Sequence, residues 1–347
     1  MSLFIMTPSE ARASIIECFE AGLVPSLESS PGVGKSSLIH QIAADFQLYV
    51  IDLRLSMCAP EDLMGLPSRE GKKSVFSPFA MFPIRGDAIP KGYKGWILFL
   101  DEFTSATKAV QAAAYKVVLD RMVGQEYLHE SVFIACAGNK MTDGAIVTEM
   151  GTAMQSRLVH IQINPSFPEF IKYANQQLFD YRVIGYLESQ PSKLHEFDPD
   201  HNDKTFACPR TWEFASKLIK GKSFEQVNLP LLAGTISEGA AVAFHAFLKE
   251  YEYLPKIEEI IADPQTAPVP DRTSTQYATA SMLLEYCTKA NFGKLATYMK
   301  RFSADFQVVF FRGVVARDKT MERNPEYVSS IQHLTRFLND NNAALAA

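Results

Sequence analysis

The sequence has no long run of apolar residues and no paired cysteines. No stretch approaches the roughly 18 consecutive apolar residues of a membrane span, so no transmembrane helix is expected. The first residues lack a basic segment followed by an apolar one, so we expect no signal peptide. The five cysteines are scattered and without C-x-x-C spacing, which argues against a disulfide framework and a zinc site. Free cysteines fit a reducing, cytoplasmic location.

Positive charge is not in excess either. The chain carries 34 Lys and Arg against 39 Asp and Glu, and this net charge of −5 does not favour a broadly basic nucleic-acid surface. This net charge is still compatible with a local basic patch. The 347 residues, 47% of them hydrophobic, are enough for two or three domains with a real core. The seven histidines lack the spacing of metal ligands, so no transition-metal site is expected.

What the chain does contain is a glycine-rich loop between an expected strand and an expected helix. From Ser29 it reads Ser-Ser-Pro-Gly-Val-Gly-Lys-Ser-Ser, close to the pattern G-x-x-x-x-G-K-[ST]. We expect a strand at residues 25–27 before it and a helix at residues 38–46 after it. In such a loop, backbone N–H groups and the helix N-terminus bind phosphate. The alternative is a glycine-rich turn that only caps a helix.

This loop supplies the candidate nucleotide contacts. Lys35 would reach the β- and γ-phosphates, and the hydroxyl of Ser36 would bind Mg²⁺. Ser29 stands where the pattern has its first glycine, which would tolerate a positive φ that serine resists. The expected nucleotide-binding residues are Ser30, Pro31, Gly32, Val33, Gly34, Lys35, Ser36 and Ser37.

An acidic pair follows a later apolar strand. Residues 96–100 read Trp-Ile-Leu-Phe-Leu and lead into Asp101 and Glu102. Asp101 would hold Mg²⁺ directly or through water, and Glu102 would polarise the attacking water. Alone, such a pair is often only a solvated strand end, but here it complements the phosphate loop.

Three further polar residues are candidates for the nucleotide site because of their positions at the ends of expected strands and helices. Asn139 follows the strand expected at residues 132–137, where its amide could bond the γ-phosphate or orient water. Arg157 precedes the last core strand and could reach the nucleotide of a neighbouring subunit. Arg210 follows Pro209 at the start of a helix and could fold onto the γ-phosphate. The alternatives are a turn-forming asparagine for Asn139 and a surface arginine on the first helical turn for Arg210, while Arg157 is a candidate by its position alone.

Strands and helices alternate from residue 20 to residue 163, which predicts a three-layer α/β domain around a mainly parallel sheet. The expected strands are 25–27, 48–53, 96–100, 132–137 and 158–163, and residues 54–95 are expected to be irregular. From Pro165 helical spacing dominates, most clearly at 168–179, 209–220, 239–251, 275–288, 292–302 and 322–338. We therefore expect an α/β core at 1–163, a helical lid at 164–250, and a helical extension at 251–347 with a disordered tail.

Taken together, these motifs resemble those of an AAA+ ATPase with a P-loop core. The segments that carry the resemblance are Pro-Gly-Val-Gly-Lys-Ser from Pro31, Ile-Leu-Phe-Leu-Asp-Glu-Phe from Ile97, Ala-Gly-Asn from Ala137, Ser-Arg-Leu-Val-His-Ile from Ser156 and Pro-Arg-Thr from Pro209. Within that superfamily the chain is most similar to the MoxR branch, through Pro60-Glu61-Asp62-Leu63-Met64-Gly65 and the stretch from Ala137 to Asp143. Phe103-Thr104-Ser105 departs from it, replacing a usual polar Asn-Arg pair.

The resemblance implies ATP hydrolysis with Mg²⁺ at the subunit interfaces of a ring, usually a hexamer. It makes Asn139 sensor 1, Arg157 the arginine finger and Arg210 sensor 2. It also implies remodelling or activation of a protein complex, often with a von Willebrand factor A domain partner. Two alternatives stay open: a nucleic-acid motor or loader of the same superfamily, and a nucleotide-gated scaffold without turnover.

Residues 54–95 are the expected place of partner contact, because the resemblance places this insert at the axis or top of the ring. The candidate contact residues are Arg69, Lys72, Lys73, Phe76, Phe79 and Phe82. For the aromatic ones, packing in the core is the favoured interpretation.

Overall fold

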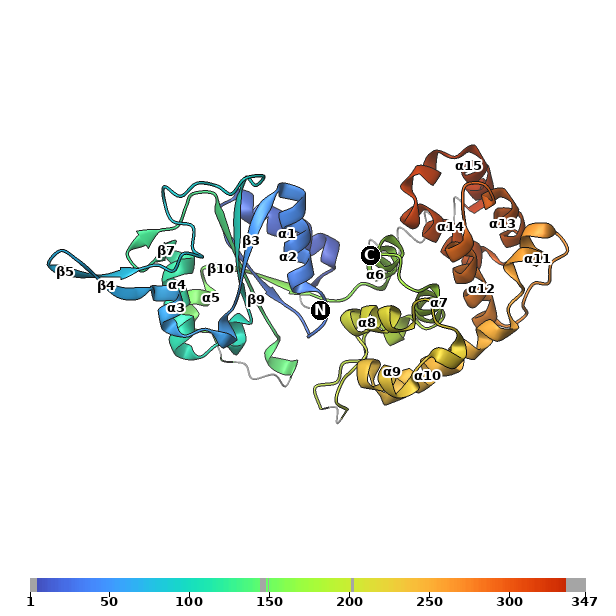
Figure 1. The fold of residues 1–347 in the computed structure, drawn as a ribbon, viewed down its shortest axis with the longest axis horizontal. Coiled ribbons are helices and arrows are strands. Elements are labelled where there is room, and N and C mark those ends of the chain that lie inside the picture. The colour runs from blue at the N-terminus through green and yellow to red at the C-terminus, as the bar shows by residue number, and fades with distance from the viewer. Residues whose placement is uncertain (1–4, 144–147, 149, 201–202, 335–347) are drawn as a thin grey trace. The chain divides into compact units, whose positions relative to one another are not determined.

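The computed structural model describes residues 5–143, 148, 150–200 and 203–334. The chain divides at Pro165 into an α/β unit and, from Ser166 onward except for Asp198–Asp200, a helical unit (Figure 1). The expected fold class, a three-layer α/β core followed by a helical region, is confirmed. None of the described helices has the length and apolar character needed to cross a bilayer. The tail at 339–347, expected to be disordered, lies outside the described residues.

A parallel sheet forms the centre of the α/β unit. Among the described residues it has six strands, in the order β1-β10-β2-β9-β6-β3. The strands are β1 Ile5–Met6, β2 Val24–Glu28, β3 Leu48–Arg54, β6 Gly95–Asp101, β9 Val132–Gly138 and β10 Leu158–Ile163. All five expected strands are present, and β1 is an addition at the edge, where Ile5 lies opposite Gln162. Because β2, β9 and β6 are parallel neighbours, their carboxyl ends meet at one edge of the sheet.

Helices cover both faces of this sheet. Successive residues of a strand point to opposite faces, so each strand packs against both layers of helices. These helices are α1 Pro8–Glu20, α2 Lys35–Phe46, α3 Pro60–Met64, α4 Lys108–Leu119 and α5 Thr152–Gln155. Ile97 and Phe99 of β6 belong to the same buried cluster as side chains of α1 and α2. Leu98 and Leu100 belong to the cluster formed with α3, α4 and α5. The apolar run of β6 is therefore buried on both faces, between the helical layers of Figure 1.

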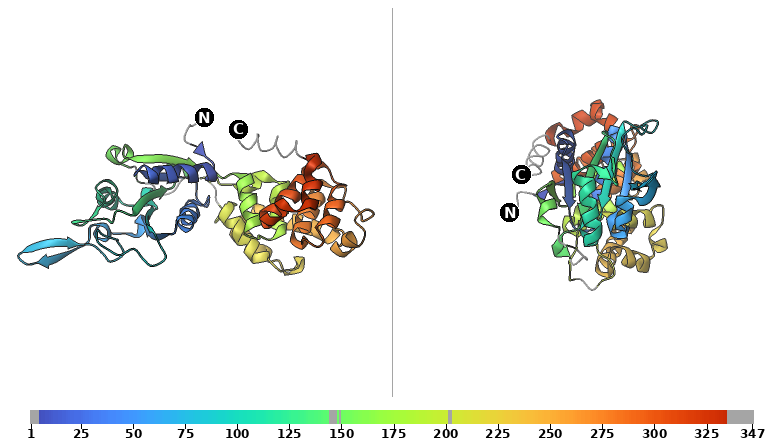
Figure 2. Two further views of the ribbon diagram at one scale, coloured as in Figure 1. Left: turned by 90° about the horizontal axis from the view of Figure 1, so that it is seen from above. Right: turned by 90° about the vertical axis from the view of Figure 1, so that its left-hand side faces the viewer.

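The expectation that residues 54–95 are irregular is wrong. After α3, strands β4 Leu66–Glu70 and β5 Lys73–Ser77 pair antiparallel and form a hairpin, which we call the arm. The arm projects from the α/β unit (Figures 1 and 2), and nearly all of its residues are exposed. Because neither face of the arm is buried, no alternation of apolar and polar residues marks it in the sequence. A second, shorter hairpin follows α4, with β7 Met122–Val123 and β8 Glu126–Tyr127.

The three aromatic candidates for partner contact in this segment differ in their burial. Phe82 is 2% exposed, and Phe79 packs against the same core cluster. Phe76 lies on the arm and is 45% exposed. Packing in the core, the interpretation favoured from the sequence, therefore holds for Phe79 and Phe82, and Phe76 alone of the three stays a candidate for contact.

The second unit is built from helices around two apolar clusters. Its helices are α6 Phe167–Gln176, α7 Tyr181–Ser189, α8 Pro209–Ile219, α9 Leu229–Ile236, α10 Glu238–Leu248, α11 Ile257–Ala262, α12 Thr273–Tyr286, α13 Phe292–Met299, α14 Ala304–Arg317 and α15 Pro325–Ile331. The first cluster contains Trp212 and Phe244, and the second contains Leu295 and Phe310. Each segment expected to be helical contains a helix, whereas α7, α9, α11 and α14 were not predicted.

Candidate nucleotide-binding site

The phosphate loop lies between β2 and α2, as the sequence predicted. Gly34 is the N-cap residue of α2, with a positive φ of 105°, and no side chain caps this helix. The N–H groups of the first helical turn are therefore left to other acceptors. A loop that ends at an uncapped helix N-terminus offers an anion both N–H donors and partial positive charge.

Ser29, the departure from the sequence pattern, fits this loop without strain. Its φ is not among the positive values, so the conformational freedom of glycine is not needed at this position. Ser29 is fully buried, and its hydroxyl donates to the Ser30 carbonyl at 2.9 Å. Lys35 Nζ donates to both the carbonyl and the hydroxyl of Ser29, each at 3.0 Å. The serine therefore adds a contact to Lys35 that glycine could not make.

Lys35 and Ser36 each reach a residue that follows or ends another strand. Lys35 Nζ donates to Asn139 Oδ1 at 3.1 Å, and Ser36 Oγ donates to Asp101 Oδ2 at 2.9 Å. Asn139 directly follows β9, and Asp101 is the last residue of β6. The parallel order of the sheet brings these strand ends together, which is why side chains 104 positions apart in the sequence meet here.

Glu102 follows Asp101 in a left-handed backbone conformation, with a φ of 55°. Such a conformation costs a residue about 1–3 kcal/mol and clusters at functional sites. The N–H of Glu102 donates to Asp101 Oδ1 at 2.8 Å, and the hydroxyl of Ser56 donates to Glu102 Oε2. Ser56 lies in the short helix η1 Leu55–Met57, directly after the strand that pairs with β6. Sequence reasoning missed Ser56, because its place beside Glu102 depends on the pairing of β3 with β6.

A further carboxylate adds negative charge at this edge. Burial, followed by the charge of Asp101, raises the pKa of Asp52 on β3, while His40 and Arg54 oppose this effect. His40 Nε2 lies 3.8 Å from Asp52 Oδ2. Because Asp52 and Asp101 repel each other, a cation beside them is favoured. Asp52 was also missed from the sequence.

Arg157 and Arg210 are both exposed. Arg157 precedes β10, and its Nη1 donates to the Ala153 carbonyl at 2.7 Å. Arg210 is the second residue of α8 in the helical unit. Their roles as arginine finger and sensor 2 stay predictions, because these roles require a bound nucleotide and, for Arg157, a second subunit.

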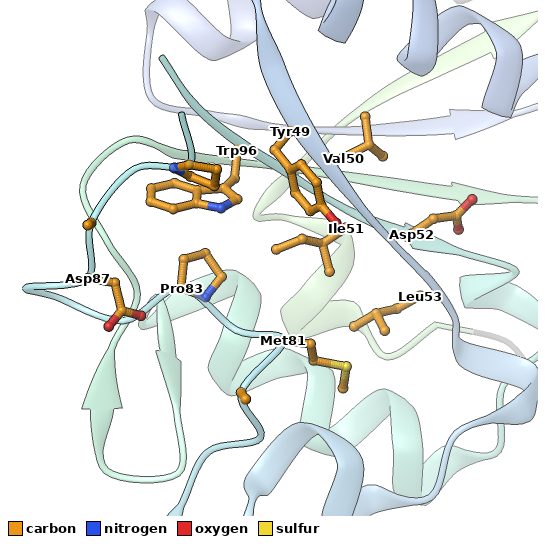
Figure 3. A pocket seen from close by; sticks show the side chains of 12 residues that line it. Tyr49, Val50, Ile51, Asp52, Leu53, Met81, Pro83, Asp87 and Trp96 are labelled. Carbon is orange, nitrogen blue, oxygen red and sulfur yellow. The ribbon is translucent and has the colours of Figure 1, made fainter. Parts of the chain in front are cut away.

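A separate groove of about 740 Å³ runs beside the edge strand β3. Tyr49, Ile51 and Leu53 of that strand line it, together with Met81 and Pro83 from the loop after the arm (Figure 3). Asp52 and, from β6, Trp96 also line it, but no residue of the phosphate loop does, so we assign it no part in phosphate binding.

The residues at the strand ends suit Mg²⁺ and a triphosphate. Mg²⁺ prefers oxygen ligands and usually takes only one or two from the protein, with phosphate and water supplying the others. Ser36 Oγ and Asp101 Oδ2, 2.9 Å apart, are such a pair. Within the part of the chain that the structure describes, no group of three or more His, Cys, Asp or Glu could hold a metal ion. This donor set fits a magnesium ion shared with phosphate better than a metal held by protein alone.

Comparison with known sequences identifies the region that carries this site. Residues 27–158 match the family described as ATPase family associated with various cellular activities (AAA). This part of the chain is an AAA ATPase domain. The matched region contains the phosphate loop, the acidic pair, Asn139 and Arg157, so for this region the match supports the predicted AAA+ resemblance and, in general terms, an ATPase function. No curated protein matches the sequence.

Among solved structures, the chain is similar to NtrX from Brucella abortus in complex with ADP. The identity is 13% and the TM-score 0.40, over 95% of this chain and 68% of that one. A mutant of RuvB from Thermotoga maritima is 16% identical with a TM-score of 0.39, over 84% of this chain and 86% of that one. Similarity at this level supports no inference about what this chain binds or acts on.

Proposed function

We propose that this chain is an ATP-hydrolysing, MoxR-like ring ATPase that remodels or activates a protein complex. Two contacts carry the proposal: Ser36 with Asp101 at 2.9 Å, and Lys35 with Asn139 at 3.1 Å. They gather a hydroxyl, a carboxylate, an ammonium and an amide at the uncapped N-terminus of α2. This is the set of groups that phosphoryl transfer to water requires.

Each residue has a distinct part in the proposed reaction. The backbone N–H groups between Gly32 and Ser37 and the Lys35 ammonium would hold the phosphates of ATP, whereas Pro31 has no N–H and would only shape the loop. Ser36 and Asp101 would hold Mg²⁺, which supplies positive charge against the phosphate oxygens. Glu102 would polarise the attacking water, and Asn139 would contact the γ-phosphate or orient that water.

A second subunit completes the proposed site. Arg157 is exposed, as a residue that reaches a neighbouring chain must be, and it would supply positive charge to the transition state of that neighbour. Arg210, at the start of α8, would act as sensor 2 from a helical lid at 164–250, followed by the extension at 251–347. The two apolar clusters of the helical unit support this division. A hexamer is the proposed assembly.

The arm is the proposed place of contact with a partner, such as a von Willebrand factor A domain protein. Its tip exposes Arg69, Lys72 and Lys73, and its base exposes Phe76. These positive charges also favour a nucleic-acid motor. ATPase rates with and without single-stranded or duplex DNA separate the two, because strong stimulation at moderate salt would favour the nucleic-acid alternative.

Glu102→Gln tests the hydrolysis itself. We expect ATP affinity to stay within about twofold, because glutamine preserves the shape, and turnover to fall at least about 100-fold, because the water is no longer polarised. Glu61→Gln, at an exposed position of α3, is the matched control and should retain turnover. If the wild-type protein shows no turnover with Mg²⁺ even when assembled, the proposal fails and the scaffold alternative is favoured.

A further inference from the structure

Thr104 lies between the two groups to which the proposed function assigns contact with water and phosphate. It belongs to the short helix η2 Phe103–Ser105, two residues after Glu102, and is 7% exposed. The N–H of Asn139 donates to Thr104 Oγ1 at 3.1 Å, and this hydroxyl donates to the Asn139 carbonyl at 3.3 Å. Because a hydroxyl can donate and accept at once, one side chain holds both backbone polar groups of Asn139.

Asn139 needs this support because its strand pairing has ended. The pairing between β2 and β9 runs to Gly138, which lies opposite Glu28. A Cβ on Gly138 would lie 2.5 Å from Thr104 Oγ1 and 2.7 Å from Thr104 Cγ2. Glycine at this position leaves the space that the threonine fills. Both branches of the Thr104 side chain therefore pack against the backbone directly before Asn139.

The backbone of Thr104 is itself anchored. The N–H of Thr148 donates to the Thr104 carbonyl at 2.6 Å. Gln111 of α4 is 2% exposed, and its Nε2 donates to the carbonyls of Phe103 and Thr148, both at 3.2 Å. The position of Thr104 is thus set by α4, so its hydroxyl is a fixed support rather than a side chain that adapts to Asn139.

We propose that Thr104 is a positioning residue that holds the Asn139 amide beside Lys35 and links it to Glu102. This inference rests on the proposed function. Asn139 Oδ1 accepts from Lys35 Nζ at 3.1 Å, so a displaced Asn139 backbone would move the amide from the expected place of the γ-phosphate. Because Glu102 and Thr104 belong to one short segment, the water-polarising carboxylate and the phosphate-contacting amide are held in a fixed relation.

The first test measures nucleotide discrimination and needs no turnover. In a Glu102→Gln background, the affinities for ATP and ADP are measured with and without Thr104→Val. Valine keeps the shape but removes the hydroxyl, so we expect the preference for ATP over ADP to fall about tenfold. Thr104→Ser keeps the hydroxyl and should hold the preference within about threefold. An unchanged preference in Thr104→Val overturns the inference.

The second test is a double-mutant cycle on turnover. Thr104→Val should lower kcat about 10- to 100-fold, as expected for a misplaced catalytic group. In an Asn139→Ala background the same change should alter kcat less than about twofold, because the amide that Thr104 positions is already absent. If the two defects instead multiply in full, Thr104 acts on general packing and the inference is wrong.

Two more variants control for folding. Thr279→Val removes a buried hydroxyl of α12, which donates to the Thr275 carbonyl at 2.7 Å, and should leave kcat unchanged. Gly138→Ala presses on Thr104 from the opposite side and should reproduce the defect even if Thr104→Val does not fold, whereas normal kcat and discrimination there would count against the inference. Absence of turnover in the wild type would refute the proposed function alone. The preference for ATP over ADP would still decide the role of Thr104.

Discussion

Replacing Glu188 by glutamine should remove a pH dependence from the stability of the helical unit. Glu188 lies on α7, and although part of the residue reaches the surface, its carboxyl group is almost entirely enclosed. Burial raises the pKa of Glu188 from 4.5 to about 7, and the charge of Arg312 on α14 opposes this only in part. Tyr277 of α12 also lies beside the carboxyl group. Arg312 Nη2 is buried without a hydrogen-bond partner among the described residues.

The magnitude follows from the difference between the folded and unfolded pKa. A folded-state pKa of about 7 against 4.5 corresponds to about 3 kcal/mol. Because the folded state holds the proton more tightly, the stabilisation is fully present below pH 4.5 and is lost as the pH rises to about 7. Above that pH the contribution no longer changes. The ionisation of Glu188 should therefore lower the free energy of unfolding by about 3 kcal/mol as the pH rises from 4.5 to well above 7.

Trp212 provides the assay, because it is fully buried in the helical unit. With Trp96 of the α/β unit changed to phenylalanine, urea unfolding followed by tryptophan fluorescence reports on the helical unit alone. Between about pH 5 and pH 8, the parent should lose about 2.5 kcal/mol more stability than Glu188→Gln. Glu258→Gln, at an exposed position of α11, should behave as the parent. Equal losses in the parent and in Glu188→Gln would refute the reasoning.

Two further predictions concern the arm and the proposed subunit interface. Gly65→Ala should destabilise the α/β unit by roughly 2–5 kcal/mol, because φ is 85° and the Cβ would lie 2.3 Å from the Ser77 carbonyl oxygen. Gly71 is also left-handed, but no atom lies within 4 Å of the place of its Cβ, so Gly71→Ala should cost only about 1–2 kcal/mol. Equal shifts of the two variants in thermal unfolding would contradict this. Arg157→Ala should abolish turnover, and mixing with Glu102→Gln subunits should restore part of it. Mixed rings without any recovery would exclude action between subunits.

The candidate site was largely predictable because its residues belong to short local patterns. A phosphate loop requires glycine where φ is positive, as at Gly34, and a lysine and hydroxyl at fixed offsets. Asp101 and Asn139 were found because each comes at the end of an apolar strand, and parallel strands end at the same edge of a sheet. Ser29 replaces the first glycine of the pattern, yet its backbone needs no special conformation and its hydroxyl contacts Lys35.

Ser56, Asp52 and Thr104 were missed as parts of the site because no local pattern marks them. Ser56 and Asp52 matter through the adjacency of β3 and β6, which depends on the strand order. Thr104 was noticed only as a departure from the family pattern, and its bonds to Asn139 depend on how η2 packs against the end of β9. Such contacts join residues that are distant in the chain.

Helix α14 shows that local sequence patterns also fail to predict some of the secondary structure. Phe306, Val308, Phe310, Phe311 and Val314 are all buried, and their β-branched and aromatic side chains favour strands in isolation. The segment is nonetheless helical, because it lies in the apolar cluster of the second unit and is covered on several sides. A helix that is apolar nearly all round has no amphipathic period to recognise.

The sequence by itself determined the phosphate loop, the acidic pair after β6 and the alternation of strands and helices, since each depends on backbone preference or on the periodicity of neighbouring residues. Only the tertiary structure decided that Ser36 meets Asp101, that Ser56 meets Glu102 and that Thr104 holds Asn139. The physical reason is that these contacts follow from strand order and burial. Both are properties of the packed chain rather than of any one segment.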